Sequence, residues 1–143
     1  MAIATKQPAR KRALHQSKPQ LLTAPDLTQF PWLVHGFSIR SGGSSTVYGG
    51  RSLNLGFTKD DSRKNVEENR RRLLLAMGAA RRTSPWPLVT LRQIHSDQIH
   101  VISSPEPESG PLAGDGLTTR LPGVALGILT ADCFPVLLVD TKK

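Results

Sequence analysis

Hydrophobic and polar positions divide the 143-residue chain into a polar start and a patterned body. Residues 1–20 are polar and basic and show no periodicity. From Leu21 onward, short apolar runs alternate with stretches rich in glycine, serine and proline. The chain has no internal repeat. This organisation predicts a disordered basic tail over 1–20, followed by one α+β domain over 21–143 with a mixed β-sheet and flanking helices.

One segment, 60–78, has the periodicity of an amphipathic helix. Its apolar stripe consists of Val66, Leu73, Leu74 and Met77. Three residues before the first turn are suitable N-caps: Asp60, Asp61 and Ser62. Gly78 supplies a natural C-terminal stop. The arginine run at 70–72 is expected to lie on the solvated face of this helix.

Short apolar runs elsewhere predict strands at 32–39, 88–93, 98–102, 124–131 and 135–139. The last two runs are apolar almost without alternation, so both of their faces are expected to be covered. The sequence SGGSSTVYGG at 41–50 lacks the pattern of a phosphate-binding loop and is interpreted as a flexible loop. A polar, proline-rich connection is expected at 103–113.

The net charge of +8 lies mostly in the tail and therefore says little about the partners of the domain. The tail carries five basic residues and no acid, which leaves a balance of only +3 for the remainder. No aromatic residues interleave with the basic residues of the tail, so no specific nucleic-acid role is indicated.

Two features bear on location. The longest apolar stretch, 124–139, is interrupted by Thr130, Asp132 and Pro135, which argues against a membrane span. The single cysteine, Cys133, cannot form an internal disulfide, and no apolar signal-peptide core precedes Leu21. We therefore expect a cytoplasmic protein.

Three short stretches place reactive side chains at strand ends or turns: QIH at 93–95, GDG at 114–116 and ADC at 131–133. Cys133 and His95 are suitable zinc or copper ligands, and they are equally the parts of a cysteine–histidine nucleophile pair. They lie 38 positions apart, so no local spacing selects between these chemistries. A buried apolar cysteine and a solvated histidine are the alternative interpretation.

Five motifs occur together in this order: LVHGFSIR, SLNLGF, LVTLRQIH, GDGLTT and LGILTADCFPVLLVD. In these motifs the chain resembles the laccase-domain family, formerly described as multicopper polyphenol oxidases and now as purine nucleoside phosphorylases with adenosine deaminase activity. The resemblance extends from about residue 28 to residue 140. It implies a cysteine-hydrolase-like fold of the toxin deamidase type.

The resemblance also implies a metal, generally zinc, with copper as the alternative. Its ligands would be His95, Cys133 and a histidine of a His-Ala-Gly-Trp-Arg-Gly motif. That third motif follows the cysteine strand in the family and is not among these 143 residues, so we expect a C-terminally truncated form whose apolar strands are prone to association. The remaining histidines that could substitute are His15, His35 and His100, of which His35 in LVHGF is the best placed.

The implied reaction is attack of phosphate on C1′ of a purine nucleoside such as adenosine, inosine or guanosine. Deamination of adenosine and phosphorolysis of methylthioadenosine are further implied activities. Four residues are candidates for orienting the substrate or the metal ligands: Asn54, Gln93, Asp115 and Asp132. Asp132 adjoins Cys133 in an extended segment, so the two side chains should point to opposite faces.

Two alternatives remain open on the sequence. Cys133 could be a nucleophile activated by His95 in a hydrolase that needs no metal. The chain could also be an inactive or split fragment that works only with a separate C-terminal half or by self-association.

Overall fold

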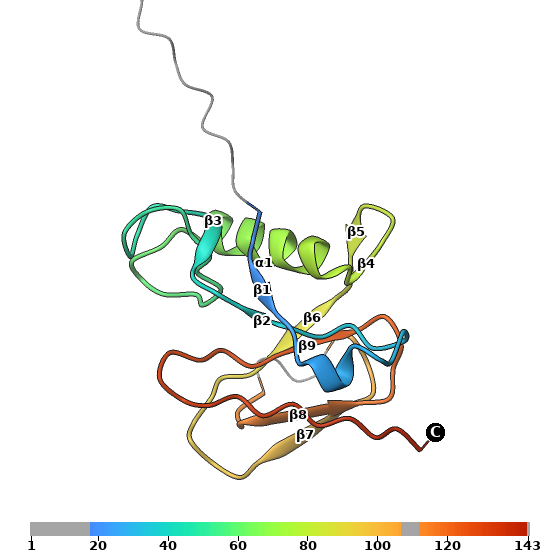
Figure 1. Ribbon diagram of the computed structural model, residues 1–143. Coiled ribbons are helices and arrows are strands. Elements are labelled where there is room, and N and C mark those ends of the chain that lie inside the picture. The colour runs from blue at the N-terminus through green and yellow to red at the C-terminus, as the bar shows by residue number, and fades with distance from the viewer. Residues whose placement is uncertain (1–17, 107–111, 143) are drawn as a thin grey trace, which may run out of the picture.

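The computed structural model describes residues 18–106 and 112–142 (Figure 1). It is a mixed α/β structure, as the sequence predicts at this level. The elements of the first half are β1 (Leu21–Leu22), a 3-10 turn η1 (Pro25–Leu27), β2 (Phe37–Ser38), β3 (Ser41–Ser45) and α1 (Arg63–Met77). Those of the second half are β4 (Ala80–Arg81), β5 (Ser84–Pro85), β6 (Leu88–Thr90), β7 (Ile99–Ile102), β8 (Gly116–Thr119) and β9 (Ala125–Gly127).

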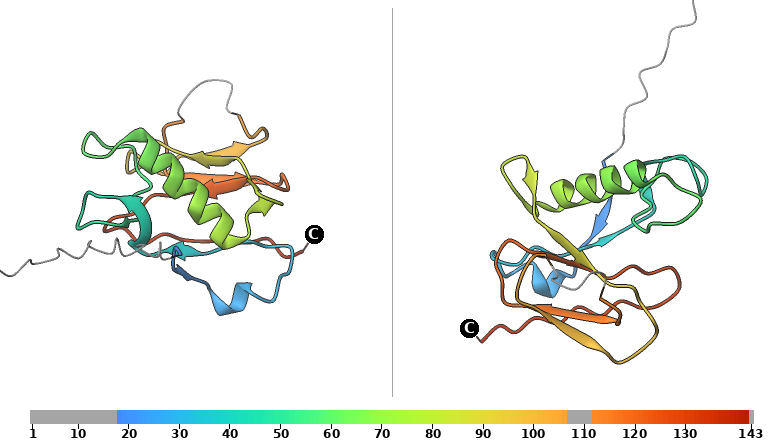
Figure 2. Two further views of the ribbon diagram at one scale, coloured as in Figure 1. Left: turned by 90° about the horizontal axis from the view of Figure 1, so that it is seen from above. Right: turned by 180° about the vertical axis from the view of Figure 1, so that it is seen from behind.

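The strands pair in both directions, but in four separate two-stranded ladders instead of one continuous sheet. β1–β2 and β4–β5 are antiparallel, whereas β6–β9 and β7–β8 are parallel. Figures 1 and 2 show the β6–β9 ladder in the middle, with α1 on one side and the β7–β8 ladder on the other. The β6–β9 ladder therefore connects the helical part to the outer strands.

The helix is confirmed, with Ser62 as its N-cap. The Ser62 hydroxyl accepts a hydrogen bond from the Asn65 amide at 3.2 Å. Gly78 ends the helix in the left-handed region at φ 78°, where a side chain would be strained. Val66 and Leu74 from the predicted stripe are buried.

The arginine run at 70–72 was predicted to be solvated, and this is wrong for two of its members. Arg70 Nε donates to the Leu55 carbonyl at 2.8 Å, and Arg72 Nε donates to the Gly42 carbonyl at 3.1 Å. Arg71 alone stays on the exposed side, where it pairs with Glu68. Arg70 and Arg72 therefore attach the helix to neighbouring backbone.

The predicted loop at 41–50 is also a correction, because its first half is strand β3. The Gly43 amide donates to the Arg51 carbonyl at 3.0 Å, and Ser41 and Ser45 both bridge to Ser52. A Cβ atom on Gly43 would overlap the Ser52 backbone. The glycines therefore permit a close backbone approach that other residues would prevent, and do not indicate flexibility.

The predicted strand at 135–139 is absent, and its faces are not covered. Phe134 is 96% exposed, Val136 78% and Leu138 88%. Within the described residues no strand pairs with this segment, so its apolar pattern has no partner to satisfy. The strands predicted at 32–39, 88–93 and 124–131 are shortened to β2, β6 and β9, and β8 was not predicted.

Most of the predicted tail, residues 1–17, lies outside the described residues. Residues 18–20 lie against the body: the Ile39 amide donates to the Gln20 carbonyl at 3.2 Å. A Cβ on Gly42 would come within 2.6 Å of the Lys18 carbonyl oxygen. In the ranges 18–106 and 112–142, no helix is both long and apolar enough to cross a membrane.

Candidate functional site

The QIH and ADC motifs leave the same edge of the central ladder. β6 and β9 are parallel and in register from Leu88 with Ala125 to Thr90 with Gly127. Both motifs follow the carboxyl ends of these strands, which is the edge where α/β structures commonly place ligands.

One hydrogen bond joins the two segments beyond that edge. Gln93 Oε1 accepts from the Leu129 amide at 2.9 Å. Gln93 was predicted to orient substrate or ligands, and its observed partner is backbone. Its carbonyl oxygen therefore holds the strand that leads to Cys133 beside the strand that leads to His95.

His95 lies in a turn whose backbone is held by Asp115. The carboxylate accepts from three consecutive amides: Ile94 at 3.2 Å, His95 at 3.1 Å and Ser96 at 2.8 Å. The Ser96 hydroxyl adds a fourth hydrogen bond at 3.0 Å. His95 itself has φ 58°, in the left-handed region that non-glycine residues rarely adopt.

The hydrogen bonds to Asp115 lower the pKa of its carboxyl group below the usual range. The largest cause is the Ser96 amide, and burial, the next largest, acts in the opposite direction. The charged form is therefore the one that holds the turn.

Gly114 and Gly116 allow Asp115 to reach this position. A Cβ on Gly114 would lie 3.0 Å from both the Gln98 carbonyl and the His100 ring. A Cβ on Gly116 would lie 2.7 Å from Cγ1 of Ile99. The two glycines of the GDG motif are therefore sterically required, because they let the start of β8 pack closely against the start of β7.

Cys133 is a free, exposed thiol, and Asp132 beside it is exposed as well. A thiol and an imidazole suit zinc or copper in kind. Within residues 18–106 and 112–142, however, no three histidine, cysteine or acidic side chains gather into a metal-holding group. The described residues therefore do not form a metal site by themselves.

The substitute histidines are engaged elsewhere. His35 Nε2 lies 3.1 Å from the Ala24 amide and 3.2 Å from the Ala24 carbonyl. His100 Nε2 lies 2.8 Å from the Ala113 carbonyl oxygen. His15 falls outside the described residues. The two described histidines thus have backbone-binding roles in this fold.

Asn54 lies in a turn beside the helix. Its side-chain oxygen accepts from the Gly56 amide at 3.1 Å, and its side-chain nitrogen donates to Asp61 at 2.8 Å. Both polar atoms of the side chain are occupied by the protein. The structure thus shows Asn54 as part of a turn.

The sequence did not reveal the polar network that Asn54 joins. Asp61 also accepts from the Ser45 hydroxyl at 2.5 Å and from Asn65 at 3.0 Å. The Ser45 bond is the largest of the causes that lower the pKa of Asp61 from 3.8 to about 2. Asn69 is fully buried beside this carboxylate.

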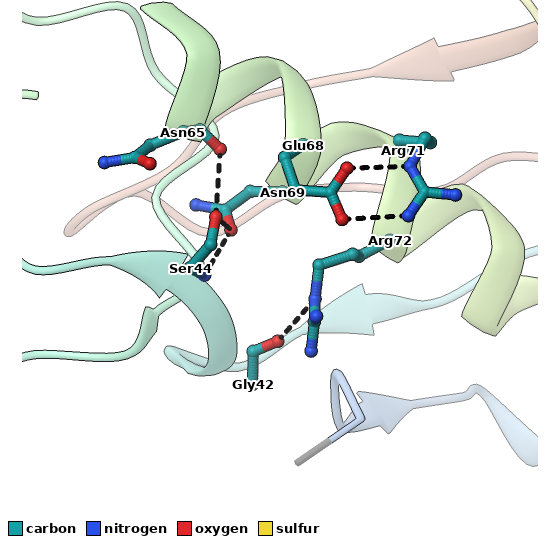
Figure 3. Close-up of polar contacts among 7 residues, drawn as sticks. All are labelled: Gly42, Ser44, Asn65, Glu68, Asn69, Arg71 and Arg72. Carbon is teal, nitrogen blue, oxygen red and sulfur yellow. Dashed lines mark hydrogen bonds and ion pairs between the residues drawn. The ribbon is translucent and has the colours of Figure 1, made fainter. Parts of the chain in front are cut away.

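Asn69 uses both ends of its amide to hold three segments together. Its oxygen accepts from the Ser44 amide and hydroxyl, as Figure 3 shows. Its nitrogen donates to the Ser45 hydroxyl and to the Ser52 and Asn54 carbonyls. The signal available in the sequence was an asparagine on the apolar side of the helix, three positions after Val66.

The family model described as multi-copper polyphenol oxidoreductase laccase matches residues 34–143. A purine nucleoside phosphorylase of Deinococcus radiodurans is 42% identical over 123 residues, covering 85% of this chain and 43% of the relative. The mouse purine nucleoside phosphorylase LACC1 is 35% identical over 112 residues, covering 77% of this chain and 24% of the relative.

Among solved structures, the hypothetical protein YfiH of Bacillus licheniformis matches with a TM-score of 0.50 and 29% identity. The match covers 64% of this chain and 36% of YfiH. The chain therefore spans less than half the length of the relatives that it matches. Because the family model covers most of the sequence, and both candidate motifs lie within it, the chain belongs to the multi-copper polyphenol oxidoreductase laccase family.

Proposed function

We propose that this chain contributes the QIH and ADC part of a purine nucleoside phosphorylase. The observation that carries the proposal is the 42% identity to the Deinococcus phosphorylase over 85% of the chain. The joined edge of β6 and β9 supports it, because Gln93 ties the two motif-bearing segments together there.

The proposed reaction is transfer of the ribosyl group to phosphate. An oxygen of phosphate forms a bond to C1′, the bond from C1′ to the purine nitrogen breaks, and the base leaves with a proton. The products are the free base and ribose 1-phosphate. We propose adenosine, inosine and guanosine as substrates, and a cytoplasmic location in keeping with the single reduced cysteine.

His95 is the residue of this chain best placed to act on the leaving base or on phosphate. Its side chain is exposed at the ladder edge and makes no hydrogen bond to any other described residue. Imidazole can donate or accept a proton near neutral pH. Adenosine deaminase and methylthioadenosine phosphorylase activities, and zinc as the metal, are further parts of the proposal that rest on the family resemblance alone.

A second candidate is a hydrolase with Cys133 as its nucleophile. The exposed thiol, which has no bond to another described side chain, favours this alternative. A cysteine hydrolase would also agree with the toxin deamidase type of fold that the family resemblance implies. Such an enzyme would need neither phosphate nor metal, and this separates the two proposals.

The test is release of hypoxanthine from inosine, with and without phosphate. Two proteins are compared: the 143-residue chain, and this chain joined to the C-terminal portion of the Deinococcus relative. We expect phosphate-dependent release from the joined protein and little from the chain alone, since the described residues supply only part of a donor set.

Cys133→Ala in the joined protein should reduce turnover at least about 100-fold. Asp97→Asn is the matched control, because Asp97 is exposed on the neighbouring turn and should leave turnover unchanged. Release that does not need phosphate and survives metal chelation, yet is lost in Cys133→Ala, would replace the phosphorylase with the cysteine hydrolase.

A further inference from the structure

We infer that Asp115 is a positioning residue, which acts through the backbone of the His95 turn. The inference rests on the proposed function, since it concerns the presentation of His95 at the ladder edge. Asp115 itself directs its carboxylate to the turn. Its two oxygens accept all four of the hydrogen bonds from Ile94, His95 and Ser96.

Three consecutive amides that converge on one carboxylate fix the path of the chain at those residues. The bonds come from a residue about twenty positions away, so the conformation of the turn is imposed by the fold and not by local sequence. The imposed conformation is strained at His95, whose φ is 58°. Glycine would meet the same backbone requirement without strain.

A histidine in that position therefore needs an explanation from its side chain. The imidazole is exposed and makes no hydrogen bond within the described part of the chain, so it does not stabilise the turn. The strain is maintained by Asp115, and it fixes the direction of the Cα–Cβ bond from which the imidazole extends. This is the arrangement expected when a reactive side chain must be preorganised.

The attachment of Asp115 is rigid. Its own amide and that of Gly116 both donate to the Gln98 carbonyl, at 3.0 and 3.1 Å. Gly116 then begins the β7–β8 ladder, opposite Ile99. The carboxylate is thus held at the end of a parallel ladder, and it transmits that fixed position to the turn that follows β6.

The first test is amide hydrogen exchange by NMR on the 143-residue chain, together with the ring resonances of His95. Asp115→Ala should raise exchange at the Ile94, His95 and Ser96 amides at least about tenfold and shift the His95 ring signals. Val66 and Leu74 should keep their protection. Asp115→Asn retains one oxygen acceptor and should give an intermediate result.

Asp97→Asn is the matched control, because it removes a carboxylate from the same turn that accepts no hydrogen bond from a described residue. It should leave the exchange rates and the ring signals unchanged. Unchanged exchange in Asp115→Ala would overturn the inference. Loss of protection throughout the chain would do the same, because it would give Asp115 a general structural role.

The second test uses the joined phosphorylase described above. Asp115→Ala should lower kcat at least about tenfold with KM within about twofold, and Asp115→Asn should recover part of the loss. Unchanged kcat in Asp115→Ala would overturn the inference while the proposed function stands. A different outcome would separate the two proposals. If neither the joined protein nor its variants showed phosphorolysis, while Asp115→Ala still raised exchange at the turn, the proposed function would be refuted. The role of Asp115 in holding the His95 turn would then stand.

Discussion

The C-terminal segment 128–142 is richer in apolar residues than the α1–β3 region, yet its apolar side chains are the more exposed. In the first region Val66 and Asn69 are fully buried, and every polar group of Asn69 is paired. In the second region Phe134, Val136 and Leu138 are the most exposed large hydrophobic side chains of the described residues. The contrast is visible in Figure 2, where the helix lies against the body and the C-terminal segment runs as irregular backbone.

The difference teaches that apolar sequence specifies a strand only where a partner is present. β3 is made of glycine and serine, yet it forms because residues 51–53 and the helix supply backbone and side-chain partners. Residues 135–139 have the composition of a buried strand and pair with no strand among the described residues. Partner availability therefore outweighs intrinsic propensity in both regions.

The largest expected effect is at Asn69. Asn69→Leu would leave the Ser44 amide and two backbone carbonyls without their partner inside the structure. Buried unpaired polar groups are costly, so we expect a loss of about 3 kcal/mol in the free energy of unfolding, measured by urea denaturation. Glu67→Gln on the exposed face is the control and should change it by less than about 0.5 kcal/mol. A loss below about 1 kcal/mol in Asn69→Leu would contradict the role given to this network.

The second-largest expected effect is a difference in unfolding free energy between two leucine-to-alanine variants, one from each region. Leu74 is 5% exposed and Leu138 is 88% exposed. Leu74→Ala should cost about 2–3 kcal/mol of unfolding free energy, because it leaves a cavity under the helix. Leu138→Ala should change it by less than about 0.5 kcal/mol. Equal costs in urea denaturation would show that the C-terminal segment is packed after all.

The smallest effect concerns pH and Asp61. Its pKa is lowered from 3.8 to about 2, chiefly by the Ser45 hydroxyl, so its contribution to stability is present above the unfolded pKa. The contribution is lost as the pH falls through the folded pKa. Because the carboxyl group is partly open to solvent, screening reduces the contribution to about 1 kcal/mol.

The comparison is between the wild type and Asp61→Asn, by urea denaturation from pH 6 to pH 2. The wild type should be more stable by about 1 kcal/mol at pH 6, and the gap should close near pH 2. A gap that persists at the acidic end would mean that the Asp61 charge is not its source.

Much of the helix could be predicted from the sequence. The cap at Ser62, the stop at Gly78 and the stripe through Val66 and Leu74 depend on local rules, and all are observed. The strand β3 could not be predicted, because its glycines serve a close approach to Ser52 that only the tertiary structure defines.

The sequence offered candidate residues for the site, but it did not indicate the contacts between them. The resemblance singled out His95 and Asp115, yet nothing local indicates that one carboxylate binds the backbone of Ile94, His95 and Ser96. The contacts of Asn54 with Gly56 and Asp61 could not be predicted either, because its Asn-x-Gly sequence fits a turn and a substrate-orienting residue equally well. His95 and Cys133 as joint metal ligands stay a prediction.

The central claim is that the α1–β3 region finds its packing partners within the described chain, whereas the segment 134–138 finds none there. Residue-resolved amide hydrogen exchange tests it directly, on the 143-residue chain at a concentration where ultracentrifugation finds a monomer. The account predicts strong protection at Val66 and Leu74, and exchange near the unstructured rate at Phe134, Val136 and Leu138. Protection of these three amides equal to that of the helix would contradict it.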